Sequence, residues 1–377
     1  MSKRILPQDR MGQRILFTPG PLTTTNTVRE AMRIDIGSWD RDCITVTQEI
    51  REGLVALVKG RTDLQCTPMQ GSGTFAVEAV LGSAVPPSGK LLVLSNGAYG
   101  QRMKLMSDAL RIPYVFLEDP EDQPHRPEML DRVLTKDTEI THVACVHCET
   151  TTGLLNPIRE LGHVVSQHQR HLIVDAISTF GAYSMGRGEE IDFDVGPIDH
   201  LILSANKGLE GVPGCGFVLS SEQAIQQTKG IARSLSMDLH DQWNYMKQCG
   251  RFRFTPPTHV LLAMRQALRE LVEEGGVEKR EARYRENHRV LVNGMRHMGF
   301  EPLIKSDFRS HIITAFLEPD GSFEFEKFYQ HLHREGFIVY PGKLTDVPTF
   351  RIANIGSIDT PEIQELLQAI KTYCELR

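Results

Sequence analysis

The chain has 377 residues, 40% hydrophobic and 24% charged, a composition typical of a folded globular protein about twice the length of an average domain. Its 42 Lys and Arg residues against 48 Asp and Glu residues give a net charge of −6, which argues against a protein that binds nucleic acid by neutralising many phosphates. Residues 1–20 lack the apolar core of a signal peptide and no run reaches the roughly 20 apolar residues of a membrane helix, so we expect a soluble, cytoplasmic protein.

The first informative segment is Gln70–Ala76, which is rich in small residues and directly precedes the helical run Val77–Ala84. Its centre, Ser72-Gly73-Thr74, presents backbone N–H groups and the positive end of a helix dipole to an anion. The segment predicts a phosphate site, although a plain glycine turn has the same pattern. A dinucleotide fingerprint would also need an acid about 20 residues later, where Lys90–Leu92 stand instead.

Short apolar or β-branched runs then alternate with helical patterns. The expected strands are Leu91–Ser95, Tyr114–Leu117, His142–His147, Leu172–Asp175 and His200–Ser204. This alternation predicts an α/β protein with a mostly parallel sheet. Such sheets bind ligands beyond the carboxyl ends of their strands, so the residues that follow each run are candidates for a site.

From about Pro257 the pattern changes to long helices closed by glycine, which suits a helix C-cap. The elements expected here are helices Val260–Glu274, Glu278–Met298, Phe323–Glu335 and Pro361–Leu376, and strands Ile312–Leu317, Ile338–Tyr340 and Thr349–Ile352. We therefore predict a large domain over residues 16–256 and a smaller α+β domain over residues 257–377, with residues 1–15 packing near the smaller one.

Seven cysteines are scattered along the chain, an odd number that suits free thiols in a reducing compartment. Only Cys145 and Cys148 form a CxxC pair, and no second pair completes a zinc site. We interpret both as strand residues and predict no metal.

Two chemically useful side chains follow neighbouring predicted strands. Asp175 ends the run Leu172–Asp175, and Lys207 follows the run His200–Ser204, so both are expected at the same edge of the sheet. Taken singly, Asp175 could be a helix cap and Lys207 a solvated turn lysine. Together with a phosphate site they match the needs of pyridoxal phosphate, which requires an amine for a Schiff base and a carboxylate beside its ring nitrogen.

Together with longer matching segments, these residues make the sequence resemble the class V aminotransferases, pyridoxal-phosphate enzymes of fold type I. The resemblance runs nearly from end to end and is carried by Leu16–Met32, Gln70–Ala84, Ser95–Met103, His147–Ile158, Ile173–Ser178, Ser204–Gly214, Arg253–His259, Tyr340–Lys343 and Phe350–Gly356. It implies a large domain with a mostly parallel seven-stranded sheet flanked by helices, plus a smaller α+β C-terminal domain. The motifs TPGPLTT, ETTTG and VPG resemble the phosphonate branch, which implies amino transfer from 2-aminoethylphosphonate to pyruvate.

The resemblance also implies roles for single residues. Lys207 would form the Schiff base and act as general base, and Asp175 would keep the ring nitrogen protonated. Tyr99 would stack on the ring, although a turn tyrosine explains it equally well, and Thr150 would approach the ring hydroxyl. Arg351 would bind the acidic group of the substrate through its planar guanidinium, with an ordinary surface ion pair as the alternative.

The phosphate contacts implied by the resemblance come from two subunits. Ser72, Gly73 and Thr74 would hold the phosphate from one subunit. Thr255 and Thr258 would help to bind the phosphate of the neighbouring subunit's cofactor. The implied catalytic unit is therefore a homodimer with shared active sites, whose other partners are small-molecule substrates.

Two segments depart from the family pattern, Gly37–Cys43 and Gly208-Leu209-Glu210. Arg41 in the first would add positive charge for a phosphonate dianion, or is simply solvated. Two other hypotheses remain. An alanine:glyoxylate or serine:pyruvate aminotransferase of the same class would share every cofactor residue, whereas a non-catalytic dinucleotide- or phosphate-binding protein would be colourless.

Overall fold

A seven-stranded sheet forms the centre of the computed structural model, which describes residues 14–305, 307–342 and 347–376. The strand order is β3-β12-β11-β9-β6-β4-β5. The strands are β3 (Leu64–Gln70), β4 (Lys90–Ser95), β5 (Tyr114–Glu118), β6 (Ile140–Val146), β9 (His171–Asp175), β11 (Ile198–Ser204) and β12 (Cys215–Ser221). Strand β12 is antiparallel to both of its neighbours, whereas the other adjacent pairs are parallel. The predicted α/β class with a mostly parallel sheet is confirmed.

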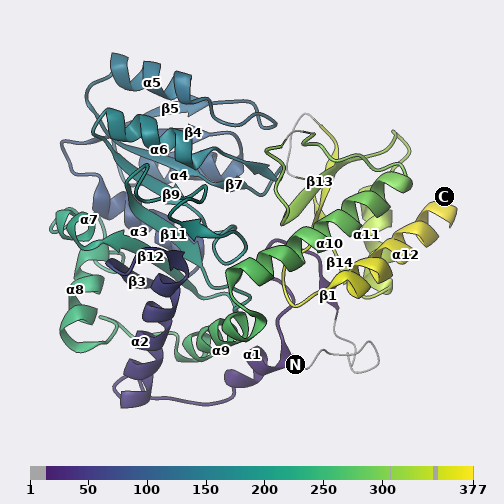
Figure 1. The fold of residues 1–377 in the computed structure, drawn as a ribbon, viewed down its shortest axis with the longest axis horizontal. Helices are drawn as coiled ribbons and strands as arrows, with labels where there is room; N and C mark the ends of the chain where they lie inside the picture. Colours follow the sequence, from purple (N-terminus) through teal and green to yellow (C-terminus); the bar gives the residue numbers. More distant parts are fainter. Residues whose placement is uncertain (1–13, 306, 343–346, 377) are drawn as a thin grey trace.

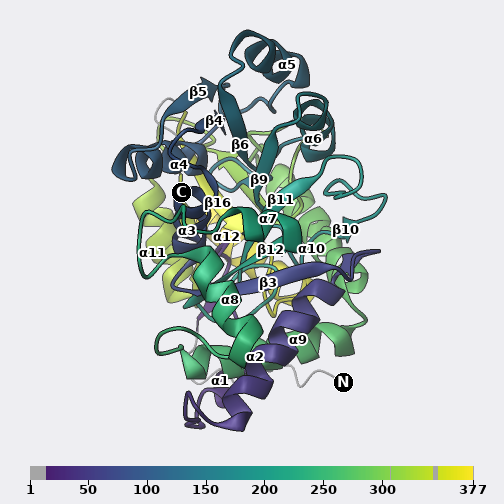
Figure 2. The same cartoon turned by 90° about the vertical axis from the view of Figure 1, so that its left-hand side faces the viewer.

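Alternate residues of the strands face two separate layers of helices, as the two-residue period of a strand requires. Leu91 and Val93 of β4 pack with α3 (Gly73–Ala84), α4 (Ala98–Ala109) and α8 (Leu239–Cys249). Leu92 and Leu94 of the same strand pack with α2 (Arg41–Ala56), α5 (Pro127–Lys136) and α6 (Ile158–Gln167). Figures 1 and 2 show the sheet between these two layers. Both faces are therefore buried, which explains the nearly continuous apolar runs in the strands.

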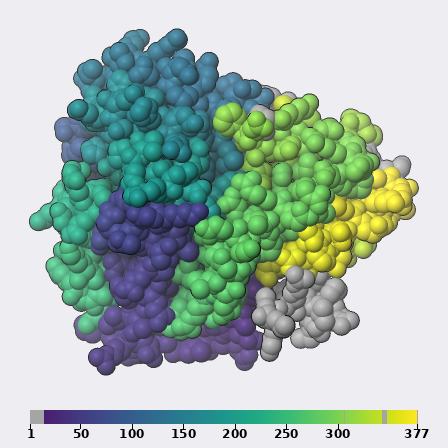
Figure 3. Space-filling model, viewed as in Figure 1, coloured from purple at the N-terminus to yellow at the C-terminus, as the bar shows by residue number. Residues whose placement is uncertain are grey.

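A second, smaller sheet lies beside the large one (Figure 1). Its order is β13-β16-β15, and the central strand β16 (Thr349–Ala353) is antiparallel to both β13 (Ile313–Leu317) and β15 (Tyr340–Pro341). Its core also takes side chains from α10 (Val277–His297), α11 (Phe325–Arg334) and α12 (Thr360–Leu376). The long helix α10 runs from one part of the molecule to the other, and the space-filling view shows the two parts in broad contact (Figure 3).

The start of the described chain lies beside the small sheet. Strand β1 (Ile15–Leu16) pairs with β14 (Phe337–Ile338), and Ile15 is buried in the core of the small sheet. Residues 1–13 of the predicted N-terminal segment lie outside the described residues. Helix α9 (Thr258–Glu274) follows the predicted boundary and packs on α1 (Asn26–Ala31) and α2 (Figure 2). The division of the chain at residue 257 stays a prediction.

Short ladders complete the fold. Strand β2 (Val58–Lys59) pairs with β10 (Met185–Gly186), β7 (Cys148–Glu149) pairs with β8 (Leu154–Leu155), and helix α7 (Glu222–Gln227) follows β12. Cys145 and Cys148 lie in the buried strands β6 and β7, as predicted. Among the helices of the described ranges, none combines the length and the apolar run needed to cross a bilayer.

Candidate active site

A cavity of about 180 Å³ lies at the carboxyl ends of β6, β9 and β11. It is the position at which open parallel sheets bind ligands. The predicted site residues that line it are Ser72, Gly73, Thr74, Tyr99, Thr150, Asp175 and Lys207. Residues far apart in the sequence therefore share one cavity, and the sheet edge brings them together.

Lys207 stands in the turn after β11, and its stem is enclosed by backbone. A Cβ on Gly20 would lie 2.6 Å from Lys207 Cδ, so only glycine lets the segment between β1 and α1 pass this close. Burial lowers the pKa of the Lys207 amine to about 8, although the negative charge of Asp175 acts in the opposite direction. The neutral, nucleophilic share of the amine near neutral pH is therefore much larger than in an ordinary lysine, although the protonated form still dominates.

Asp175 is the last residue of β9 and is 6% exposed. One carboxylate oxygen, Oδ1, accepts a hydrogen bond from the Ile177 N–H at 2.9 Å. Burial raises the pKa of Asp175 to about 6, a shift that the N–H of Ile177 and the charge of Lys207 reduce. Additional positive charge in the cavity would hold this carboxyl fully ionised.

The N-terminus of α3 forms a wall of the cavity. Ser72 is its N-cap residue and makes no side-chain cap hydrogen bond, and the helix begins at Gly73. A Cβ at Gly73 would lie 2.5 Å from Ile177 Cδ1, so glycine allows the helix to approach the loop after Asp175. The first turn of a helix carries N–H groups and partial positive charge, which favour an anion.

Arg102 adds a full positive charge to the same wall. It lies on α4, donates from Nη1 to Thr74 Oγ1 at 3.1 Å and places its guanidinium 4.9 Å from the centre of the Tyr99 ring. The sequence analysis did not identify it. Its spacing from Tyr99 would have indicated it, because residues three apart on a helix lie on the same face.

Tyr99 and Thr150 contact one another directly: the Thr150 hydroxyl donates to the Tyr99 hydroxyl at 3.2 Å. Glu149 is fully buried beside them, and it accepts from the N–H of Tyr99 at 3.0 Å and from the N–H of Thr151 at 3.1 Å. Glu149 is a second residue that the sequence analysis missed. Its carboxylate ties the start of α4 to the segment that carries Thr150.

Arg351 on β16 reaches the site from the small sheet. It is 3% exposed, and it donates from Nε to the Pro341 carbonyl at 3.0 Å and from Nη1 to the Thr150 carbonyl at 3.1 Å. Burial lowers its pKa, which the negative charge of Glu149 partly offsets. The guanidinium is thus a buried group beside Thr150, which does not fit a surface ion pair.

Comparison with known proteins identifies the family of this chain. The family model described as aminotransferase class-V matches residues 30–358. The chain belongs to the class V aminotransferase family.

Curated relatives of this aminotransferase match over almost the whole chain. It is 48% identical over 364 residues to the 2-aminoethylphosphonate–pyruvate transaminase of Phocaeicola vulgatus, which covers 96% of this chain and 99% of the relative. It is also 48% identical over 358 residues to the enzyme of that name from Bacillus cereus, which covers 94% of this chain and 96% of the relative. Among solved structures, the alanine–glyoxylate aminotransferase from Nostoc sp. is similar in fold, with a TM-score of 0.86, 23% identity, and coverage of 100% of this chain and 97% of that one.

The two threonines predicted to act on a second subunit lie away from the cavity of this aminotransferase. Thr255 is exposed in the segment before α9, and Thr258, the first residue of α9, is half-buried. Neither lines the cavity formed by this chain alone. Their predicted roles require a second copy of the chain.

Proposed function

We propose that the chain is a pyridoxal-phosphate-dependent aminotransferase that moves the amino group of 2-aminoethylphosphonate to pyruvate, giving phosphonoacetaldehyde and L-alanine. The observation that carries the proposal is the cavity that joins the Lys207 amine, the Asp175 carboxylate and the N-terminus of α3. Relatives at 48% identity named for this activity support the same choice of substrates.

The residues around the cavity fit pyridoxal phosphate. Lys207 offers an amine whose pKa burial lowers to about 8, and Asp175 offers a buried carboxylate whose pKa burial raises to about 6. Ser72, Gly73 and Thr74 offer a helix start for the phosphate. When bound, this cofactor supplies an electron sink for the pair of electrons left after a proton is removed from the amine-bearing carbon.

The chain's own residues then have distinct tasks. The neutral Nζ of Lys207 takes the proton from the amine-bearing carbon of the donor, as a general base. With pyridoxal phosphate bound, the charge of Asp175 would keep its ring nitrogen protonated, and Thr150 and Tyr99 would contact its ring hydroxyl and ring face. Asp175 is held in place for this task by the Ile177 N–H at 2.9 Å.

Two arginines are placed to bind the anionic groups of the substrates. Arg351 lies beside Thr150 and Arg102 lines the cavity, so their charges favour the anionic groups of the two substrates. A phosphonate dianion and the carboxylate of pyruvate can bind in turn at one cationic site, because the amino group and the keto group react at the same position.

The proposal includes a homodimer in which Thr255 and Thr258 serve the partner's phosphate site. Large apolar side chains are exposed in the same part of the molecule: Phe254 is 52% exposed and Leu235 is 78% exposed. Exposed apolar groups of this size suit a protein interface. The proposal also includes a cytoplasmic location, which rests on the scattered cysteines of the sequence.

A donor and acceptor panel tests the substrates. We expect kcat/KM for 2-aminoethylphosphonate with pyruvate to exceed that for alanine with glyoxylate or serine with pyruvate by about 100-fold or more, as sites that pair a charged substrate group discriminate strongly. Phosphonoacetaldehyde and alanine are to be measured as products. A higher kcat/KM for alanine with glyoxylate would instead support that class V activity.

A further inference from the structure

The turn that carries Lys207 contains a residue with no role in the chemistry above. Glu210 has a left-handed backbone with φ of +59°, which is uncommon for a residue with a side chain, and it is 4% exposed. Its N–H donates to the Lys207 carbonyl at 2.8 Å, which closes the turn. A buried carboxylate in this conformation needs partners that hold it there.

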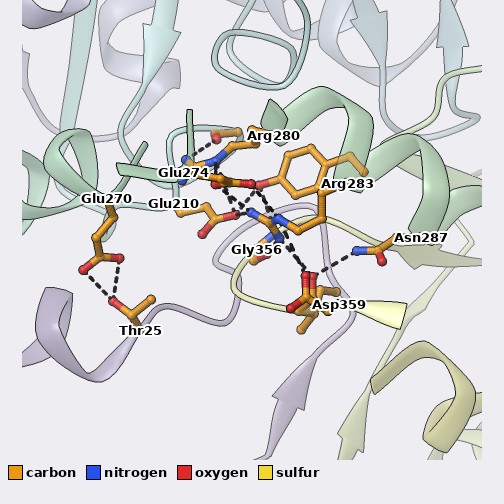
Figure 4. Close-up of polar contacts among 12 residues, drawn as sticks. Thr25, Glu210, Glu270, Glu274, Arg280, Arg283, Asn287, Gly356 and Asp359 are labelled. Atoms are coloured by element: carbon orange, nitrogen blue, oxygen red, sulfur yellow. Dashed lines mark hydrogen bonds and ion pairs between the residues drawn. The ribbon is translucent and has the colours of Figure 1, made fainter. Parts of the chain in front are cut away.

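Those partners come from α10. Arg283 Nη2 donates to Glu210 Oε1 at 2.8 Å, and the Tyr284 hydroxyl donates to the same oxygen. Arg280 Nη1 donates to the Gly208 carbonyl at 3.2 Å, directly after the lysine. Helix α10 therefore holds both the side chain and the backbone of the Lys207 turn, as Figure 4 shows for Glu210, Arg280 and Arg283.

The same helix holds the end of the strand that carries Arg351. Arg283 Nη1 donates to the Gly356 carbonyl at 2.8 Å and to the Ile358 carbonyl at 2.9 Å (Figure 4). These residues follow β16, in which Arg351 lies. The guanidinium of the half-buried Arg283 thus contacts both the turn of Lys207 and the segment that follows β16.

Glu210 is ionised in this cluster. Burial raises its pKa, but the charges of Arg280 and Arg283 have a larger combined effect and bring the pKa below its ordinary value. After burial, the largest effects on the pKa of Lys207 come from Asp175, Arg351, Cys148 and Arg102. Glu210 contacts the lysine through the backbone, because its N–H donates to the Lys207 carbonyl.

We propose that Glu210 is a positioning residue that, through Arg283 and Arg280, fixes the turn of Lys207 and its placement relative to the Arg351 strand. The role assigned to Lys207 rests on the proposed function, but the placement of its amine can be measured without cofactor or substrate. An unfixed turn would let the amine reach water, so its pKa would move up toward the ordinary lysine value.

The test compares Glu210→Gln and Glu210→Ala with the matched control Glu286→Gln. Glu286 lies on the same helix and accepts from Arg289 Nε at 2.8 Å and from Arg289 Nη2 at 2.6 Å, so its substitution removes an ion pair of α10 outside the cluster around Glu210. The first readout is reductive methylation of Lys207 in the cofactor-free protein as a function of pH, followed by mass spectrometry. The second is kcat and KM of the holoenzyme.

In both Glu210 variants we expect the methylation midpoint to rise by about one pH unit, with Glu286→Gln close to wild type. We expect kcat to fall about tenfold while KM for the donor changes less than about twofold, because a misplaced base slows the reaction without weakening substrate binding. Arg280→Lys removes the hydrogen bond from the Arg280 guanidinium to the Gly208 carbonyl, so it should also raise the methylation midpoint. If the Glu210 variants do not fold, this variant tests the proposal in their place.

A wild-type midpoint in folded Glu210 variants, or an equal shift in Glu286→Gln, would overturn the proposal, because the midpoint would then not depend on the contacts of Glu210. The methylation result does not depend on whether the proposed function is correct. Wild-type enzyme that fails to turn over 2-aminoethylphosphonate would refute the substrate assignment and leave the methylation result standing.

Discussion

Lys207 and Asp175 lie in one cavity, and burial moves their pKa values toward one another, to about 8 and about 6. Both residues could be selected from the sequence because each follows a predicted strand, and parallel strands bring their carboxyl ends to one edge. Arg102 and Glu149 could not be selected in this way, because neither follows a predicted strand. Helical spacing relates Arg102 to Tyr99, but the contacts of Arg102 with Thr74 and of Glu149 with the N–H of Tyr99 are visible only in the folded chain.

Among single substitutions in the cavity, we expect replacement of Lys207 to reduce turnover most. We expect Lys207→Ala to lose turnover and the visible absorbance band of the bound cofactor, because no other amine lies at that position of the cavity lining. Asp175→Asn should keep the cofactor but lose most of the rate, because it cannot hold the ring nitrogen protonated. Spectra and initial rates measure both effects.

The exposed lysine Lys229 provides the control, and Lys229→Ala should behave as wild type. Normal turnover in Lys207→Ala would show that the lysine assignment is wrong.

Arg351→Ala tests the substrate arginine. Loss of a buried charged partner costs about 2–5 kcal/mol, so we expect the KM for pyruvate to rise by tens-fold or more. Steady-state kinetics with pyruvate as the varied substrate measure the change. Arg334→Ala, at an exposed position on α11, is the control. An unchanged KM in Arg351→Ala would mean that this arginine does not bind the keto acid.

At the scale of elements, the five strands expected in the first part of the chain all form, whereas β3 and β12 were not predicted. Strand β3 lies at the edge of the sheet and contains Pro68, which an edge strand tolerates but which weakens the strand pattern. Strand β12 contains Gly216 and runs antiparallel, so it does not fit the simple alternation of strand and helix. Both pair through long-range contacts that sequence periodicity does not contain.

The start of α3 offers a prediction about the cofactor site. A Cβ at Gly73 would lie 2.5 Å from Ile177 Cδ1, so Gly73→Ala should push the helix start away from the loop after Asp175. We expect cofactor affinity to fall about tenfold, as hydrogen bonds from the helix start lengthen. Titration of the cofactor-free protein with pyridoxal phosphate measures the Kd.

Two further variants decide the cause of that loss. Gly82→Ala on the same helix should have no effect on Kd, because its Cβ would meet only Leu110 at 3.5 Å. Ile177→Ala added to Gly73→Ala should recover affinity by making room. If the double variant binds no better than Gly73→Ala, steric pressure from Ile177 is not the reason.

At the scale of the whole molecule, the fold buries histidines in neutral form. Burial lowers the pKa of His142, His147 and His311 to about 3 and that of His200 to about 4. Below their ordinary value of 6.5, the unfolded chain binds protons that the folded chain does not, so stability falls as pH falls. His171 opposes this trend, because its hydrogen bond to Asp199 raises its pKa.

We therefore expect the free energy of unfolding to decrease by several kcal/mol between pH 6.5 and pH 4.5, at about 1.4 kcal/mol per pH unit for each buried histidine. Urea unfolding at a series of pH values measures it. His200→Gln should reduce the slope, because one of these groups is removed, whereas stability that is constant over this range would contradict the burial of neutral histidines.

The strands and helices of the second, smaller sheet were predictable from the change of pattern near Pro257, but the way they connect to the large sheet was not. Helix α9 packs on α1 and α2, and Arg283 of α10 joins the Lys207 turn to the segment after β16. These connections depend on which buried charges meet in three dimensions. Sequence patterns indicate that a helix exists, not what its polar residues contact.

The most direct test of the central claim is one absorbance series on the purified protein with pyridoxal phosphate, to which 2-aminoethylphosphonate and then pyruvate are added. We predict that the visible band of the bound cofactor disappears with the aminophosphonate and returns with pyruvate, because each addition drives one half of the transfer. A band that only alanine or serine removes would contradict the phosphonate assignment. Absence of any band after pyridoxal phosphate is added would contradict the aminotransferase site itself.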